Sequence, residues 1–118
     1  MNAMYGLHEA LLMVKEEGIE NAWQRHREMH ESLAQGVQSL GLDFVVAGDS
    51  RLPQLNLVRC PEGLDEAAVR KRLLHDYNLE IGAGLGAFAG KVWRIGLMGY
   101  SARRENIERC ISALRSCI

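Results

Sequence analysis

The glycine-rich segment IGAGLGAFAGK is the first candidate for chemistry, because loops of this kind can bind phosphate groups. The dinucleotide-binding pattern Gly-x-Gly-x-x-Gly/Ala is met by Gly82, Gly84 and Ala87. That motif requires a helix after the loop to hold the pyrophosphate, but the segment KVWRIGLMG that follows is typical of a strand. A P-loop requires glycine and Ser or Thr where this chain has Leu85 and Val92. The segment therefore predicts neither kind of nucleotide site.

An arginine in the strand predicted over residues 91–98 is the second candidate. Side chains alternate along a strand, so Trp93, Ile95 and Leu97 share an apolar face. The other face carries Arg94 beside Gly96, which leaves free space next to the guanidinium. Such a planar fork can bind a carboxylate or a phosphate through two hydrogen bonds. The alternative is an exposed arginine on the solvated side of an antiparallel sheet.

The remaining polar residues form no recognisable catalytic or metal-binding pattern. His26 and His30 stand four residues apart on one helix, a spacing that can chelate a metal, but no acidic or cysteine partner follows at a matching offset. We interpret both as partly buried helix histidines and assign no metal. Cys60, Cys110 and Cys117 also lack ligand spacing, so reduced thiols are expected. No serine lies in a Gly-x-Ser-x-Gly turn.

Length and composition predict one globular domain, residues 1–118. Hydrophobic residues make up 47% of the chain and charged residues 25%, with a net charge of −1. This charge offers no field for a nucleic acid or an anionic membrane, so neither is expected as a partner. The chain has no apolar run long enough to span a bilayer and no recognisable signal peptide, which favours a cytoplasmic location.

Hydrophobic periodicity predicts the element order α-α-β-β-α-β-β-α. The expected helices cover residues 4–17, 19–40 and 66–77 and a last segment capped by Ser101; the expected strands cover residues 42–48, 54–60, 79–81 and 91–98. Asp65 is the expected N-cap of the third helix. The expected apolar stripe of the second helix is Ile19, Ala22, Trp23, His26, His30, Leu33, Val37 and Leu40. This pattern predicts an α+β fold, with a small three- to four-stranded, mainly antiparallel sheet and helices packed on one face.

The first helix carries apolar residues on more than one side. Met4, Leu7 and Leu11 lie on one side, and Tyr5 and Leu12 lie on another. A helix of this kind needs more than one packing partner, so we expect that the chain lacks a segment that precedes it. The alternative is a flexible N-terminus with spare apolar residues.

The segment VWRIGLMGYSARRENIERCISAL, preceded by LEIGAGLG, resembles the C-terminal signature of the alanine–glyoxylate and serine–pyruvate aminotransferases, which are class V, fold-type I pyridoxal-phosphate enzymes. The similarity extends back through RLPQLNLVRCPEG and ENAWQRHRE to MYGLHEAL, and so covers nearly all 118 residues. The segment RIGLMGY with its upstream GLG is fairly specific to the family, whereas the helices alone would not be.

The resemblance implies a small C-terminal domain packed on a larger domain that binds pyridoxal 5'-phosphate, in a homodimer. Arg94 matches the arginine that binds the substrate's α-carboxylate, and the loop with Gly84 and Gly86 would shape the entrance to the site. The implied reaction moves an amino group from alanine or serine to glyoxylate or pyruvate. The related aminoethylphosphonate transaminases are an alternative identification that the resemblance leaves standing.

The chain departs from the family in the residues that hold the cofactor. None of its lysines, Lys15, Lys71 and Lys91, lies in the Schiff-base context of the family, and no acidic partner for the pyridinium nitrogen is recognisable. We therefore expect a fragment without the large domain, inactive alone and with no bound cofactor. A stand-alone α+β module that binds a small ligand or dimerises is the alternative.

Overall fold

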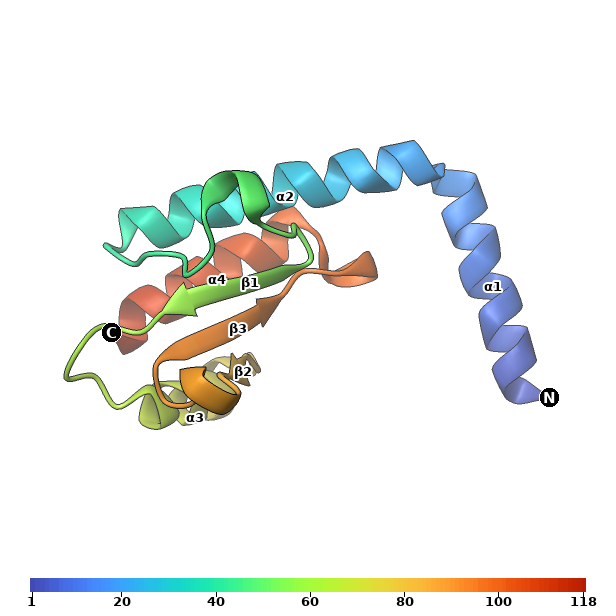
Figure 1. The fold of residues 1–118 in the computed structure, drawn as a ribbon. Helices are drawn as coiled ribbons and strands as arrows, with labels where there is room; N and C mark the ends of the chain where they lie inside the picture. Colours follow the sequence, from blue (N-terminus) through green and yellow to red (C-terminus); the bar gives the residue numbers. More distant parts are fainter.

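The computed structural model describes all 118 residues as an α+β fold with four α-helices and a three-stranded sheet, as the sequence predicts (Figure 1). The helices are α1 (Asn2–Glu17), α2 (Ile19–Ser39), α3 (Glu66–Tyr77) and α4 (Arg104–Cys117), and the strands are β1 (Leu55–Arg59), β2 (Gly82–Ala83) and β3 (Val92–Gly96). Short 3₁₀ turns lie at Gly48–Ser50, Gly86–Phe88 and Gly99–Ser101.

The sheet is antiparallel in the order β1-β3-β2, so the strand that carries Arg94 is central. Trp93, Ile95 and Leu97 are buried in a core to which α2, α3 and α4 contribute, which confirms the predicted alternation and the packing of helices on one face. Large buried side chains such as these supply most of the driving force for folding.

Two of the predicted strands differ from the structure. Residues 42–48 form only an isolated bridge at Phe44, because the Val46 carbonyl accepts a hydrogen bond from the side chain of Arg51 and the chain bends away from β1. The strand predicted over residues 79–81 instead begins at Gly82, because the Leu79 amide is bonded to the Leu73 carbonyl at the end of α3.

The helix boundaries confirm one predicted cap and correct another. The Asp65 carboxylate accepts a hydrogen bond from the Ala68 amide at 3.1 Å, as an N-cap does. Ser101 does not cap α4, because Ala102 is buried and the chain makes a 3₁₀ turn before the helix begins at Arg104.

The predicted stripe of α2 is wrong at Ile19 and Trp23, whereas Ala22 between them is buried as predicted. Ile19 and Trp23 are 53% and 60% exposed, because the first turns of α2 extend past the end of the sheet (Figure 1). Further along the helix, Leu33 and Val37 are buried as expected, and His26 and His30 are partly buried. None of the helices combines the length and apolar character that a membrane span needs.

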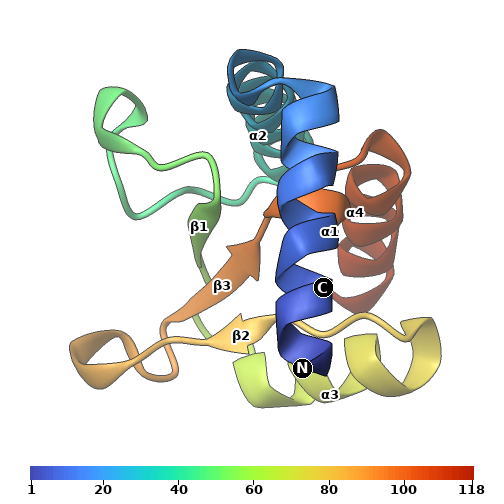
Figure 2. The same cartoon turned by 90° about the vertical axis from the view of Figure 1, so that its right-hand side faces the viewer.

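Helix α1 stands apart from the rest of the molecule. It leaves the N-terminal end of α2 at Gly18 and none of its residues is buried (Figure 1; Figure 2, turned by 90°). Its apolar side chains are exposed on more than one side, as the sequence predicts; they are Met4, Tyr5, Leu7, Leu11, Leu12, Met13 and Val14. An exposed apolar surface of this kind marks an interaction site.

Asn56 is a buried polar residue in the core face of β1. Its amide nitrogen donates to the carbonyls of Pro53 and Ile95, both at 3.2 Å, and its Oδ1 lies 2.7 Å from Nδ1 of His30. Because Asn56 Oδ1 can only accept, His30 must donate from Nδ1. This network joins α2 to β1 and β3 and leaves no buried polar side-chain atom without a partner.

We predict that Asn56→Asp destabilises the fold. The change puts a charged oxygen in place of the donor that meets two carbonyls, at a cost of about 2–4 kcal/mol in the free energy of unfolding. The matched control is Asn2→Asp, because the Asn2 side chain is exposed and makes no hydrogen bond with the chain. Urea unfolding of both variants measures the difference, and equal stabilities would contradict the role given to Asn56.

Candidate functional site

Arg94 lies in the middle of β3, on the sheet face opposite the core. The register pairs it with Leu57 of β1 on one side and Gly82 of β2 on the other, so these three residues share that face. We call this surface the Arg94 face; it also carries Val92 and Gly96. The alternation of side chains in the sequence predicts this position, and the structure places Arg94 there half-buried.

The guanidinium of Arg94 is fixed at one end and free at the other. Its Nε donates to the carbonyl of Ala83 at 2.6 Å, across the β2–β3 pair. Nη1 and Nη2 make no hydrogen bond or ion pair with the chain. The two terminal nitrogens are therefore available to an anion, and their planar fork matches the two oxygens of a carboxylate.

Three other arginines, Arg25, Arg70 and Arg72, have carboxylate partners in the chain. Arg70 is held by Glu66 at 2.7 Å, and this hydrogen bond is the main reason that the pKa of Arg70 is raised. Arg25 is paired with Glu17 in the same way. Arg94 has no acidic partner among the 118 residues, so its charge is uncompensated on a partly buried surface. An anionic ligand would supply the missing partner.

The glycine loop between β2 and β3 is compact, and four of its backbone amides, those of Gly84, Phe88, Ala89 and Lys91, donate to carbonyls of the loop or of Val92. Gly84 donates to the Val92 carbonyl, and the amides of Phe88 and Lys91 donate within the loop. A Cβ at residue 84 would collide with the Phe88 carbonyl oxygen and would lie 2.9 Å from Cγ2 of Val92. Gly86 has a left-handed backbone with φ of 57°, which favours glycine. Both glycines therefore give the loop its shape, beside Val92 on the Arg94 face.

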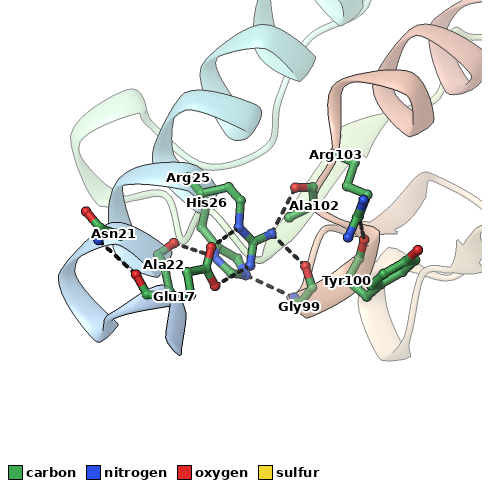
Figure 3. A network of polar contacts seen from close by, with 9 residues as sticks. All are labelled: Glu17, Asn21, Ala22, Arg25, His26, Gly99, Tyr100, Ala102 and Arg103. Atoms are coloured by element: carbon green, nitrogen blue, oxygen red, sulfur yellow. Dashed lines mark hydrogen bonds and ion pairs between the residues drawn. The ribbon is translucent and has the colours of Figure 1, made fainter. Parts of the chain in front are cut away.

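Arg25 holds the turn that follows β3, an interaction that the sequence analysis missed. Its Nε and Nη2 donate to the Glu17 carboxylate at 2.6 and 3.0 Å, and its Nη1 donates to the carbonyls of Gly99 and Ala102 (Figure 3). The hydrogen bond from Arg25 is the main reason that the pKa of Glu17 is lowered. No local signal could reveal this contact, because its backbone acceptors lie more than seventy residues away.

His26 completes the contact between α2 and this turn (Figure 3). Its Nε2 accepts a hydrogen bond from the Gly99 amide at 3.0 Å, so its Nδ1 carries the hydrogen and donates to the Ala22 carbonyl. On the far side of the turn, the guanidinium of Arg103 stacks 3.7 Å above the ring of Tyr100. The His26 ring therefore has a hydrogen-bond partner within the chain at each nitrogen.

The larger cavities do not contain Arg94. The largest, about 610 Å³, lies between α1, α2 and the turn at Gly99–Ser101, and its lining includes Met13, Met29 and Tyr100. Arg94 instead stands on an open sheet face. A ligand bound there would be covered on one side only by this chain.

The 118 residues do not fit a pyridoxal-phosphate site. Lys15, Lys71 and Lys91 are all exposed, and none lines a larger cavity that could protect a Schiff base from water. Cys60 and Cys110 offer no alternative nucleophile at neutral pH. Burial raises the pKa of Cys60 and of Cys110 to about 11, which keeps both thiols protonated.

Comparisons with known proteins confirm the resemblance seen in the sequence. The chain is 37% identical over 115 residues to the (S)-ureidoglycine–glyoxylate transaminase of Bacillus subtilis and 40% identical over 117 residues to the rat alanine–glyoxylate aminotransferase. Each match covers 98% of this chain and 28% of the relative. The crystal structure of the alanine–glyoxylate aminotransferase from Nostoc superposes with a TM-score of 0.94 and 45% identity, over 96% of this chain and 30% of that one.

No family model matches the chain. Its homologues are pyridoxal-phosphate-dependent aminotransferases, and the chain corresponds to a C-terminal part of them. It spans less than a third of the length of the relatives named above.

We predict that Gly84→Ala destabilises the glycine loop. The added methyl group meets the Phe88 carbonyl, which is backbone and cannot rotate away, so the free energy of unfolding should fall by about 2 kcal/mol or more. Gly48→Ala is the control, because a Cβ at that residue meets no atom within 4 Å. If thermal unfolding shows the same small change for both variants, the close approach at Gly84 is not real.

Proposed function

We infer that this chain is the C-terminal domain of a pyridoxal-phosphate-dependent aminotransferase related to the alanine–glyoxylate enzymes. We assign to Arg94 the binding of the substrate's α-carboxylate. The observation that carries the proposal is the free end of the Arg94 guanidinium, presented without an acidic partner in a chain that is homologous to aminotransferases over 98% of its length. The whole enzyme would move an amino group from a small amino acid, alanine or serine, to glyoxylate or pyruvate.

Arg94 would serve both halves of such a reaction. An amino acid donor and a 2-oxo acid acceptor both carry an α-carboxylate, so one fixed guanidinium can bind each in turn. Nη1 and Nη2 would bind the two oxygens while Nε stays on Ala83, and the carboxylate would thus be held in one orientation. Positioning of this kind lowers the barrier by removing rotational freedom before the reaction. Gly84 and Gly86 would shape the loop beside the bound substrate.

The open side of the Arg94 face and the apolar surface of α1 would meet a larger domain that binds the cofactor. The relatives are more than three times as long as this chain, which gives such a domain ample length. We propose a homodimer in the cytoplasm for the whole protein, in keeping with the free cysteines and the near-neutral charge. A stand-alone binding module is the less supported alternative, since the homologues are enzymes.

A chimera tests the role of Arg94. Residues 1–118 replace the matching 30% of the Nostoc alanine–glyoxylate aminotransferase, which superposes closely enough to accept them. We expect an active chimera in which Arg94→Lys lowers kcat/KM by about 10²-fold, on the order of 2–3 kcal/mol, because lysine cannot offer two parallel donors.

The matched control in that chimera is Arg115→Lys, at an exposed position in the last turn of α4. It should leave kcat/KM unchanged. Equal activities of the two variants would contradict the assignment of Arg94, and so would a loss in kcat with no change in the apparent affinity for either carboxylate substrate.

The 118 residues alone should form no stable aldimine with pyridoxal 5'-phosphate. Exposed lysines form Schiff bases that exchange rapidly with water, so no persistent absorbance band should appear at equimolar cofactor. The measurement is a visible spectrum before and after gel filtration. A band that survives filtration, and that borohydride fixes on one of the three lysines, would contradict the proposed division of the site.

A further inference from the structure

Helix α1 is joined to the rest of the chain at one end only. None of its residues is buried, and a cavity of about 610 Å³ lies between its residues Met13 and Val14 and the turn that contains Tyr100. The side-chain hydrogen bonds that join α1 to later residues all involve Glu17, the last residue of the helix. Packing therefore does little to fix the direction of α1, and the contacts of Glu17 must do so.

The backbone between α1 and α2 is a hinge. Gly18 is the single residue between the two helices, and it has a left-handed φ of 85°, which glycine adopts readily. Hinges in proteins are a few residues at the ends of elements that absorb changes in φ and ψ while the elements stay rigid. Rotation at Gly18 would change the angle of α1 unless side chains prevent it.

The pair of Glu17 and Arg25 spans this hinge (Figure 3). Nε and Nη2 of Arg25 both donate to the Glu17 carboxylate, at 2.6 and 3.0 Å, and a contact with two hydrogen bonds fixes orientation as well as distance. Nη1 of the same guanidinium donates to the carbonyls of Gly99 and Ala102, at 2.7 and 2.9 Å. One side chain therefore connects the end of α1 to the turn that directly follows β3.

We propose that Arg25 and Glu17 are positioning residues for the carboxylate site at Arg94. They fix the angle of α1 to the strand that carries Arg94. The apolar surface of α1 and the Arg94 face, which the chain leaves uncovered, are thereby presented to the larger domain in one fixed arrangement. The inference rests on the proposed roles of Arg94 and of that domain. Neither Arg25 nor Glu17 touches the substrate.

The angle of α1 can be measured in the 118-residue chain by the electron paramagnetic resonance distance between two spin labels. The labels are attached after His8→Cys on α1 and Glu108→Cys on α4, at exposed residues that make no hydrogen bond with the chain. Cys60→Ser and Cys117→Ser remove the partly exposed thiols, and Cys110 is buried and takes no label. We expect one narrow distribution of distances in this labelled chain.

Breaking the pair should release α1. We expect Arg25→Gln and Glu17→Gln each to broaden or shift the distribution of distances. Glu17→Gln leaves Arg25 able to donate to both carbonyls of the turn, so it separates the hinge from the turn. The matched control is Glu16→Gln, because the Glu16 side chain is exposed and makes no hydrogen bond with the chain. It should leave the distribution unchanged.

The chimera with the Nostoc enzyme measures the consequence for the reaction. Arg25→Gln and Glu17→Gln should each raise KM at least about threefold for both the amino acid and the 2-oxo acid, because Arg94 is no longer held in place relative to the larger domain. The double variant should be no worse than Arg25→Gln, since the two side chains act as a pair. Glu16→Gln should keep both KM values. A merely structural role would lower the fraction of folded enzyme, and with it kcat, at unchanged KM.

The outcomes separate this inference from the proposed function. If the labelled chain already gives a broad distribution, or if Arg25→Gln and Glu17→Gln do not alter it, the pair does not fix α1 and the inference is wrong. If the distances change while both KM values stay the same, the pair is structural only, and the inference is again wrong. If Arg94→Lys leaves kcat/KM of the chimera unchanged, the proposed function itself fails.

Discussion

The hydrogen bond from Nε of Arg94 to the Ala83 carbonyl is the contact on which the site depends. It uses one donor of the guanidinium to fix the side chain, and the two terminal nitrogens are left for a ligand. The bond exists because two residues, Gly82 and Ala83, pair with β3 as a very short edge strand. Without that pairing, a long arginine side chain would sample many rotamers, and ordering it on binding would cost free energy.

The rest of the fold keeps β3 in place from both ends. Before the strand, the close approach of Gly84 to Phe88 closes the loop, and after it Arg25 holds the turn through the Gly99 and Ala102 carbonyls. Arg25 can do so because Glu17 balances its charge at the bend between α1 and α2. The orientation of α1 is thus linked by direct contacts to the strand that carries Arg94, and both expose surfaces that the chain itself leaves uncovered.

Local patterns predicted those features that depend on neighbouring residues. Alternation placed Arg94 opposite the apolar face of its strand, and Asp65 capped its helix as expected. Two predictions failed because other contacts decide the structure. The bend after Phe44 follows a hydrogen bond from the Arg51 side chain, and Ser101 does not cap α4 because the next residue, Ala102, is buried in the core. The contacts of Asn56 and Arg25 with remote carbonyls have no signature in the sequence at all. The roles given to Arg94, Gly84 and Gly86 remain predictions from resemblance and geometry.

The most direct test of the account is a crystal structure of the 118-residue chain soaked with pyruvate at high concentration. We predict that the carboxylate lies within hydrogen-bond distance of Nη1 and Nη2 of Arg94, with Nε still donating to Ala83. A carboxylate bound elsewhere, or an Arg94 that leaves Ala83 to bind it, would contradict the claim that the fold presents this arginine ready for its ligand.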